Sequence, residues 1–248
     1  MHHGKTIGIL GMGSFGRFLA ELLVHHSRSD ILVFDPRSTH SVGGVSYAAN
    51  LNDLVTKADI LVLSVPLASY DEVLPHIQRY VRPQTLIIDI CSVKLKAEER
   101  LRMHLPAHNN ILCTHPLFGP QSAAHNDARG HTLIVTDSQG DLAQETEDFC
   151  SQQLGLQLVH MSADEHDKVM AQVHALTFFV AHGLREMNLP TPPFMTPSYK
   201  ELIDLIELDK KHSPELYDTI QNGNPHAKQM RQTLMDTFQR LNQADTAR

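Results

Sequence analysis

The sequence lacks the features that would place the protein in a membrane or on a nucleic acid. No apolar run among the 248 residues approaches the roughly 20 residues that a membrane-spanning helix needs. Lys and Arg number 21 against 28 Asp and Glu, and the net charge of −7 at pH 7 argues against phosphate-backbone binding as the main role. No secretory signal pattern opens the chain. We therefore expect a cytoplasmic protein with no membrane and no nucleic-acid partner.

Cysteines and metal-binding motifs are also scarce. The three cysteines, Cys91, Cys113 and Cys150, are odd in number and widely spaced, which indicates reduced thiols and no disulfide framework. Histidine is common, with 17 residues, but no H-E-x-x-H or other compact ligand set occurs among them. We expect no metal site, and no motif around any cysteine indicates a catalytic thiol.

The first 160 residues alternate short apolar runs with amphipathic segments, which is typical of a parallel sheet covered by helices on both faces. The pattern predicts strands at 5–10, 31–35, 60–64, 86–89, 111–114, 132–136 and 156–160. It predicts helices at 15–26, 51–57, 70–80, 95–105 and 142–154, the third opened by a capping box at Ser69-Tyr-Asp-Glu72. Residues 1–160 are thus expected to form an α/β domain, a Rossmann-type doubly wound, mostly parallel sheet.

Residues 161–248 are expected to form an all-helical domain. Ser162-Ala-Asp-Glu165 is a second capping box and opens a helix to about Asn188, where Leu189-Pro-Thr-Pro-Pro193 stops it. Further helices are predicted at 198–209, 214–222 and 225–243, the second with Ser213 as N-cap before Pro214. The other helices are too few to cover the apolar face of the long one, so we expect a homodimer packed through this domain. That face includes Val169, Val173, Leu176, Phe179, Val180 and Leu184.

A glycine motif, Gly11-Met12-Gly13-Ser14-Phe15-Gly16, lies between the first predicted strand and the first predicted helix. In that setting G-x-G-x-x-G indicates a dinucleotide site. The first glycine makes the tight turn, the second admits the pyrophosphate, and the third lets helix pack on strand. The helix N-terminus then offers N–H groups to the diphosphate. An ordinary glycine turn is the alternative.

The ends of the second and third strands extend this site. Asp35 follows Gly16 by nineteen residues, where a carboxylate accepts hydrogen bonds from the adenosine ribose and repels a 2′-phosphate. We therefore expect NAD to be preferred, while Arg37 could pair with such a phosphate and leaves NADP open. Ser64, Val65 and Pro66 are expected to shape the loop beside the cofactor, although a structural proline turn explains them equally well.

Two further strand ends carry reactive groups. Asp89-Ile-Cys-Ser92-Val-Lys94 closes the fourth strand, and Thr114-His115-Pro116 closes the fifth. In an open parallel sheet both face the same crevice. A histidine titrates near neutral pH, so His115 is a candidate general base, and the hydroxyl of Ser92 could orient it. A turn-filling histidine is the alternative.

These motifs together resemble the prephenate/arogenate dehydrogenases of tyrosine biosynthesis, and above all the plant arogenate dehydrogenases. The resemblance rests on the glycine motif, on Asp-x-x-Ser-Val-Lys and on Thr-His-Pro-x-Phe-Gly-Pro-Gln-Ser. Met161-Ser-Ala-Asp-Glu-His166-Asp-Lys168 and the Glu215-Leu-Tyr217 region also match, so it spans nearly the whole chain.

The resemblance implies an oxidative decarboxylation of prephenate or arogenate. NAD(P)⁺ takes a hydride from C4 of a cyclohexadiene, a histidine takes the hydroxyl proton, carbon dioxide leaves, and the ring becomes aromatic. Carried over by motif, His115 is the base and Ser92 is its hydrogen-bond partner. Aromatisation supplies the driving force, so the protein needs chiefly to orient the reacting groups.

The carboxylates of such a substrate need donors. Gln121 and Ser122, in the loop after His115, are expected at the ring carboxylate, together with Gln172 on the long helix. For the side-chain carboxylate we expect Lys200, with Lys168, Arg185 and Arg231 as competitors. His212 aligns where plant relatives carry an acidic residue that could meet the ammonium of arogenate, which favours prephenate, although Asp209 lies close by.

Two other functions stay open. Another two-domain dehydrogenase, such as a β-hydroxyacid dehydrogenase or an imine reductase, would share this layout. A hydroxyacid enzyme is expected to carry a catalytic lysine within the long helix, and Lys168 lies too near its start. A non-catalytic NAD-binding sensor would bind the cofactor without turning over either substrate.

Overall fold

The computed structural model describes residues 4–37, 41–105, 108, 110–123 and 127–246. The chain divides into two compact units, Met1–Ala163 and Asp164–Arg248. The expected division after residue 160 lies three residues before this one. Within the described residues, no helix has both the length and the apolar character needed to cross a membrane.

The first unit is built on one eight-stranded sheet with the order β3-β2-β1-β4-β5-β6-β7-β8. Neighbouring strands are parallel except β6 and β7, which confirms the expected mostly parallel sheet. The sequence pattern does not predict β3, because its two exposed residues form no apolar run. The strands are β1 (Thr6–Leu10), β2 (Asp30–Phe34), β3 (Ser46–Tyr47), β4 (Ile60–Leu63), β5 (Leu86–Asp89), β6 (Ile111–Pro116), β7 (Thr132–Gln139) and β8 (Gln157–His160).

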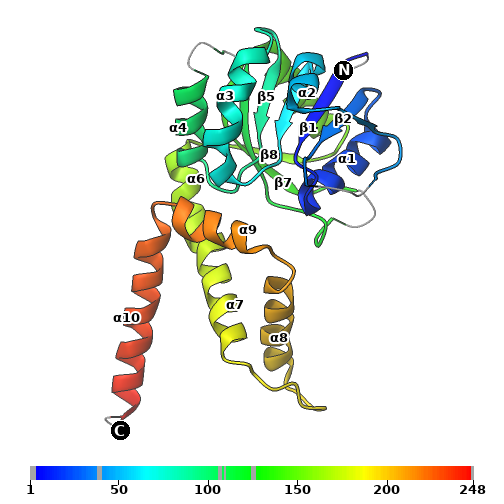
Figure 1. The fold of residues 1–248 in the computed structure, drawn as a ribbon. Coiled ribbons are helices and arrows are strands. Elements are labelled where there is room, and N and C mark those ends of the chain that lie inside the picture. The colour runs from blue at the N-terminus through cyan, green and yellow to red at the C-terminus, as the bar shows by residue number, and fades with distance from the viewer. Residues whose placement is uncertain (1–3, 38–40, 106–107, 109, 124–126, 247–248) are drawn as a thin grey trace. The chain divides into compact units, whose positions relative to one another are not determined.

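Helices cover both faces of this sheet (Figure 1). On one face, α2 (Leu51–Lys57), α3 (Tyr70–Tyr80) and α4 (Leu95–His104) share an apolar core with the strands. On the other face, α1 (Ser14–His26) and α5 (Asp141–Gln152) pack against a second core. Strands buried on both faces must be apolar at every position, which explains the continuous Ile/Leu/Val runs of the sequence.

The start of α3 differs from the sequence prediction. Ser69 was expected to open a capping box, but its side chain makes no cap hydrogen bond. A short 3₁₀ turn, η1 (Leu67–Ser69), leads directly into α3 and already holds Ser69 at φ −84° and ψ −9°. A capping residue needs extended backbone to reach forward, so the helical backbone at Ser69 prevents the cap. Asn50 does cap α2, accepting a hydrogen bond from the N–H of Asp53 at 3.0 Å.

The second unit is helical throughout its described secondary structure. Its long helix consists of α6 (Ala163–Met170), a π-helical segment η3 (Ala171–Ala175) and α7 (Leu176–Glu186). Then follow α8 (Pro197–Asp209), α9 (Pro214–Asp218), a second π-helical segment η4 (Thr219–Gly223) and α10 (Ala227–Thr246). The expected cap of α9 is confirmed, because the Ser213 hydroxyl accepts from the N–H of Leu216 at 3.2 Å and Pro214 follows it.

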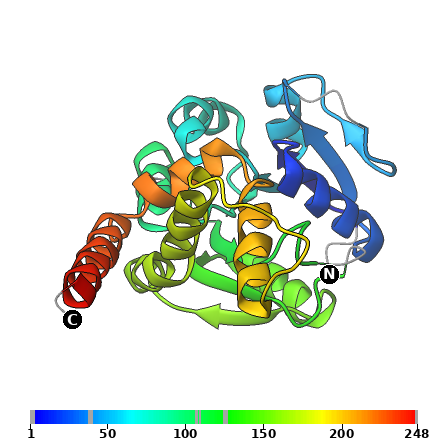
Figure 2. The same cartoon turned by 90° about the horizontal axis from the view of Figure 1, so that it is seen from below.

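The second unit encloses only a small apolar core. Ala175, Phe178, Ile220 and Ala227 form it, and Leu216 and Tyr217 pack against it. α7 and α8 lie against each other, whereas α10 contacts α7, η3 and η4 and extends away from α8 (Figure 2). Large apolar side chains therefore stay exposed on this unit, including Val173 at 59% and Phe238 at 55%.

Candidate active site at the carboxyl edge of the sheet

Five strand ends lie in a row at the carboxyl edge of the sheet. The strands β2, β1, β4, β5 and β6 are consecutive neighbours and all parallel, so their carboxyl ends meet at one edge. In that order the edge carries Asp35, the glycine turn, Ser64–Pro66, Ser92 and His115. With about 4.8 Å between strands, the row is about 19 Å long. The structure thus brings the predicted cofactor residues and the two predicted catalytic residues, Ser92 and His115, to one edge of the sheet.

The three glycines of the turn have different surroundings. Gly11 has φ +99°, and a Cβ there would lie 2.3 Å from the carbonyl oxygen of Ser64. A Cβ at Gly16 would lie 2.1 Å from the carbonyl oxygen of Gly11. A Cβ at Gly13 would meet no heavy atom within 4 Å. The first and third glycines are therefore required by the protein's own packing, while the second leaves space for a ligand.

The N-terminus of α1 is prepared for an anion. Gly13 is its N-cap and has extended backbone, and no side chain caps the helix there. The first turn of α1 contains no acidic residue. The first N–H groups of the helix and the positive end of its dipole therefore point at the space beside Gly13, which is the arrangement that binds a diphosphate.

Asp35 joins the end of β2 to the glycine turn. One carboxylate oxygen accepts from the N–H of Met12 and the other from the N–H of Arg37, each at 2.8 Å. A carboxylate offers about four lone-pair sites, so acceptor capacity remains for the hydroxyls of a ribose. The side chain of Arg37 is exposed.

Ser64, Val65 and Pro66 form the wall on the other side of the glycine turn. The N–H of Ser64 donates to the carbonyl of Leu10 at 2.8 Å, which continues the ladder beyond β4. Val65 Cγ1 would lie 3.0 Å from a Cβ at Gly11. This close packing fixes the position of the loop after β4 relative to the glycine turn.

His115 is the penultimate residue of β6 and is 3% exposed. It pairs with Ile134 of the antiparallel neighbour β7. Ser92, three residues after the end of β5, is half-buried. The imidazole is therefore shielded from bulk water at the edge where the neighbouring strands end.

The loop after His115 packs against the helix of the glycine turn. The Phe118 ring lies 6.4 Å from that of Phe15 and 6.2 Å from that of Phe18, measured between centroids. Gln121 and Ser122 are both exposed in this loop. The Ser122 hydroxyl accepts from the N–H of Gly119 at 3.0 Å and so helps to close the loop's own turn.

The other predicted substrate residues belong to the second unit. Gln172 is exposed on η3 and Lys200 is exposed on α8. The three competing cations have partners: Lys168 with Asp164, Arg185 with Asp209, and Arg231 with the backbone and side-chain oxygens of Gln221. Among the described residues, Lys200 is the one of these four cations whose side chain has no hydrogen bond or ion pair.

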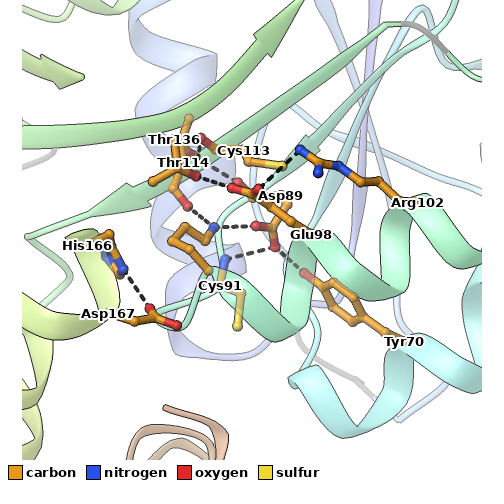
Figure 3. A network of polar contacts seen from close by, with 11 residues as sticks. Tyr70, Asp89, Cys91, Glu98, Arg102, Cys113, Thr114, Thr136, His166 and Asp167 are labelled. Carbon is orange, nitrogen blue, oxygen red and sulfur yellow. Dashed lines mark hydrogen bonds and ion pairs between the residues drawn. The ribbon is translucent and has the colours of Figure 1, made fainter. Parts of the chain in front are cut away.

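A buried polar network behind the row was not predicted. Lys94 is fully buried, and its ammonium donates to the carboxylate of Asp89 and to the carbonyl of Thr114. The other oxygen of Asp89 accepts from the hydroxyl of Tyr70 and from the N–H of Cys91 (Figure 3). The signal was in the sequence, because Asp89 and Lys94 flank Ser92, but spacing alone does not show that an ammonium is buried.

The described cysteines are free thiols. Burial raises the pKa of the Cys113 thiol well above its ordinary value, with the charge of Asp89 as the next cause. Such a thiol is not activated at neutral pH. Among the described residues, no group of three His, Cys, Asp or Glu side chains is placed to hold a metal ion.

Known proteins resemble this chain along almost its whole length. Residues 22–151 match the family model of the prephenate dehydrogenase nucleotide-binding domain, and residues 183–244 match that of the TYRAAT1-like C-terminal domain. Arogenate dehydrogenase 1, chloroplastic, of Arabidopsis thaliana is 34% identical over 224 residues, covering 85% of this chain and 35% of the relative. Arogenate dehydrogenase 2, chloroplastic, of the same plant is 30% identical, covering 94% of this chain and 68% of the relative.

The fold also matches solved structures. The crystal structure of prephenate dehydrogenase from Aquifex aeolicus, in complex with hydroxyphenyl propionate and NAD⁺, superimposes with a TM-score of 0.79 at 18% identity. The match covers 98% of this chain and 91% of that chain. The chain thus spans about a third of the length of the first plant relative but nearly all of a solved bacterial enzyme.

Proposed function

The chain belongs to the prephenate/arogenate dehydrogenase family, and on that premise we propose that it is an NAD-dependent dehydrogenase that converts prephenate to 4-hydroxyphenylpyruvate by oxidative decarboxylation. The observation that carries the proposal is the row at the sheet edge. From β2 to β6 it presents a ribose acceptor, an anion site, a loop wall, a hydroxyl and an imidazole. An extended dinucleotide with its substrate needs these groups in this order.

The cofactor is NAD, with NADP as the less favoured form. Asp35 binds the adenosine ribose and repels a 2′-phosphate, and Gly11, Met12, Gly13, Ser14, Phe15 and Gly16 hold the diphosphate at the start of α1. Arg37 lies beside Asp35, and Ser64, Val65 and Pro66 line the opposite wall. Bound NAD⁺ supplies the hydride acceptor, and the residues of the protein orient it.

His115 accepts the hydroxyl proton of the substrate, and Ser92 orients the imidazole. The low exposure of His115 supports this role, because a base that is shielded from bulk water exchanges its proton with the bound substrate. Gln121, Ser122 and Gln172 are proposed donors to the ring carboxylate. Lys200 is proposed for the side-chain carboxylate, and its lack of a partner among the described residues supports the choice.

Arogenate is the second candidate substrate, and the two plant relatives favour it. Two observations favour prephenate. Asp209, the acidic group available for an ammonium, already pairs with Arg185 at 2.8 Å. His212, which aligns with the acidic residue of plant relatives, offers no negative charge to the ammonium of arogenate. Its ring stacks on Phe178, and burial lowers the pKa of its imidazole, while the charge of Asp209 acts to raise it.

One assay series tests the proposal. Prephenate and arogenate are each combined with NAD⁺ and NADP⁺, and reduced nicotinamide is followed by absorbance. We expect turnover of prephenate with NAD⁺ to be fastest. Faster turnover of arogenate would support the second candidate, and cofactor binding without turnover of either substrate would support a non-catalytic sensor.

His115→Asn tests the base. We expect turnover to fall by about 10²- to 10⁴-fold while NAD affinity stays within twofold. His108→Asn is the matched control, because His108 lies before β6 at the opposite end of the strand and contacts the Thr85 carbonyl at 2.7 Å. Full activity of His115→Asn would refute the assignment.

We further propose that the protein is a homodimer through its C-terminal helices. Met235, Phe238 and Leu241 repeat every three residues along α10 and are 44%, 55% and 54% exposed. Val169 and Val173 on the long helix are exposed as well. A second copy of the same unit offers the matching apolar faces that a symmetric interface needs.

Light scattering at micromolar concentration tests the dimer. Phe238→Glu is expected to shift the mass towards one chain, while Arg240→Glu, rotated by about 200° on α10, leaves it unchanged. A wild-type protein with the mass of one chain would refute the dimer. A cytoplasmic location stays a prediction.

A further inference from the structure

The buried ammonium of Lys94 lies where the backbone leading to His115 loses its pairing with β5. β5 and β6 pair through Asp89 and Cys113, and their ladder ends there. On the other side of β6, the register with β7 shifts between Cys113 and Thr114. Thr114 therefore stands where the ladder to β5 has ended and the ladder to β7 is irregular.

Two hydrogen bonds replace the pairing with β5 at this point, while the pairing with β7 continues. Lys94 donates to the carbonyl of Thr114, and the hydroxyl of Thr114 donates to the carbonyl of Asp89 at 2.9 Å. The carbonyl of Thr114 belongs to the peptide group that joins Thr114 to His115. The direction of this peptide sets the direction in which the side chain of His115 leaves the strand.

Stability does not explain why a lysine stands here. Lys94 lies at the N-terminus of α4, where the helix dipole disfavours a cation. Burial is the strongest single influence and acts to lower the pKa of its ammonium, but the interactions with Asp89, Cys113 and Cys91 together outweigh it, and the pKa is raised. A buried ion pair usually adds little to stability compared with apolar side chains of similar volume. A geometric role accounts for the pair better.

Tyr70 and Cys91 complete the support. The hydroxyl of Tyr70, from α3, and the N–H of Cys91 both donate to the carboxylate oxygen of Asp89 that does not contact Lys94 (Figure 3). With these donors the carboxylate is held from two sides, and it holds the ammonium in turn. The network thus links α3, the end of β5 and β6.

We infer that Lys94, held by Asp89, is a positioning residue that fixes the Thr114–His115 peptide and thereby the direction of the imidazole. This inference rests on the proposed role of His115. In this role Lys94 acts through the peptide and does not contact the substrate or the cofactor. Its loss should therefore lower kcat and leave the KM for NAD⁺ unchanged. A displacement of about 1 Å at a reacting group can cost 10²-fold in rate.

The test uses the double variant Asp89→Asn/Lys94→Met. Removing both charges avoids leaving a buried carboxylate without its ammonium, which would strongly destabilise the fold. The matched control is Asp59→Asn/Arg82→Met. Arg82 likewise bridges a carbonyl, that of Ala58 at 2.7 Å, and a carboxylate, that of Asp59 at 2.8 Å, but near the start of β4. We expect a 10- to 100-fold lower kcat in the first double variant and an unchanged kcat in the control.

A second readout does not depend on turnover. The imidazole resonances of His115 are assigned by their absence in His115→Asn, and we expect them to move in Asp89→Asn/Lys94→Met and to stay in the control. If wild-type protein turns over neither substrate, the proposed function fails, and the resonances still decide whether Lys94 positions the imidazole. Unchanged resonances together with wild-type kcat would overturn the inference, as would an equal loss of kcat in the control.

A third variant keeps the test decisive if the double variant does not fold. Thr114→Val removes the hydroxyl bond to the Asp89 carbonyl, keeps the side-chain shape and changes no charge. Since it loosens the same peptide, it should lower kcat without raising the KM for NAD⁺. Wild-type kcat in Thr114→Val with unmoved His115 resonances would then overturn the inference.

Discussion

Asp35 gives the sharpest prediction about the cofactor. In the wild-type protein the N–H groups of Met12 and Arg37 each donate to one carboxylate oxygen of Asp35 at 2.8 Å. In Asp35→Asn one of these oxygens becomes an NH₂ group, which faces one of the two N–H groups. One of these two hydrogen bonds is therefore replaced by two opposed donors. The charged acceptor for the ribose is lost at the same time.

The expected magnitude follows from these contacts. A hydrogen bond to a charged group contributes about 1.5–3 kcal/mol, and about 1.4 kcal/mol changes an affinity tenfold. NADH should therefore bind about 10- to 100-fold more weakly to Asp35→Asn. The affinity for NADPH should fall less or rise, because the charge that repels its 2′-phosphate is gone.

Binding is measured by the fluorescence of the reduced nicotinamide, since the chain contains no Trp that would add an indole background. Asp30→Asn is the control, because Asp30 is exposed and stands at the opposite end of β2. Unchanged NADH affinity in Asp35→Asn, or an equal loss in Asp30→Asn, would refute the role of Asp35.

Two further predictions concern the glycine turn and the second unit. Gly13→Ala should leave the melting temperature nearly unchanged and weaken NADH binding, because its Cβ enters open space, whereas Gly16→Ala should lower both, because its Cβ lies 2.1 Å from a backbone oxygen. Equal melting temperatures for the two variants would contradict this. Burial, and then the charges of His212 and His166, lower the pKa of His174 to about 4, so the unfolded chain takes up its proton first as the pH falls. Stability should be complete above about pH 6.5 and fall by up to about 3 kcal/mol towards pH 4, measured by urea unfolding, and His174→Gln should flatten this dependence.

The sequence predicts the sheet and the row at its edge well, for one physical reason. Strands buried on both faces are continuous apolar runs, and their ends are marked by polar or glycine residues such as Asp35 and Gly11. Because the strands are parallel, the residues after them are bound to share an edge. No contact between distant segments has to be known for that prediction.

The network around Lys94 could not be predicted in the same way. A lysine after a strand is most often a solvated helix residue, and only the fold brings Tyr70 of α3 and the Thr114 carbonyl of β6 to it. The capping box at Ser69 failed for a related reason. The residue types fit the motif, but the preceding 3₁₀ turn gives Ser69 a helical backbone conformation that prevents the cap.

The π-helical segments are the other feature that the apolar periodicity conceals, and they bear on which cation meets the substrate. A π-helical turn frees backbone carbonyls from their usual partners. In the second unit the carbonyl of Ala175 accepts from the Gln221 amide at 2.7 Å, and the carbonyl of Gln221 accepts from Arg231 at 2.8 Å. Arg231 is therefore needed to satisfy η4, and Gln221 to satisfy η3. Both contacts of Arg231 to Gln221, to the carbonyl at 2.8 Å and to the side-chain oxygen at 2.7 Å, are made by Nη1, so this side chain is held in place by its own domain. The side chain of Lys200 has no such contact among the described residues, and this difference is the reason why we propose the lysine for the side-chain carboxylate.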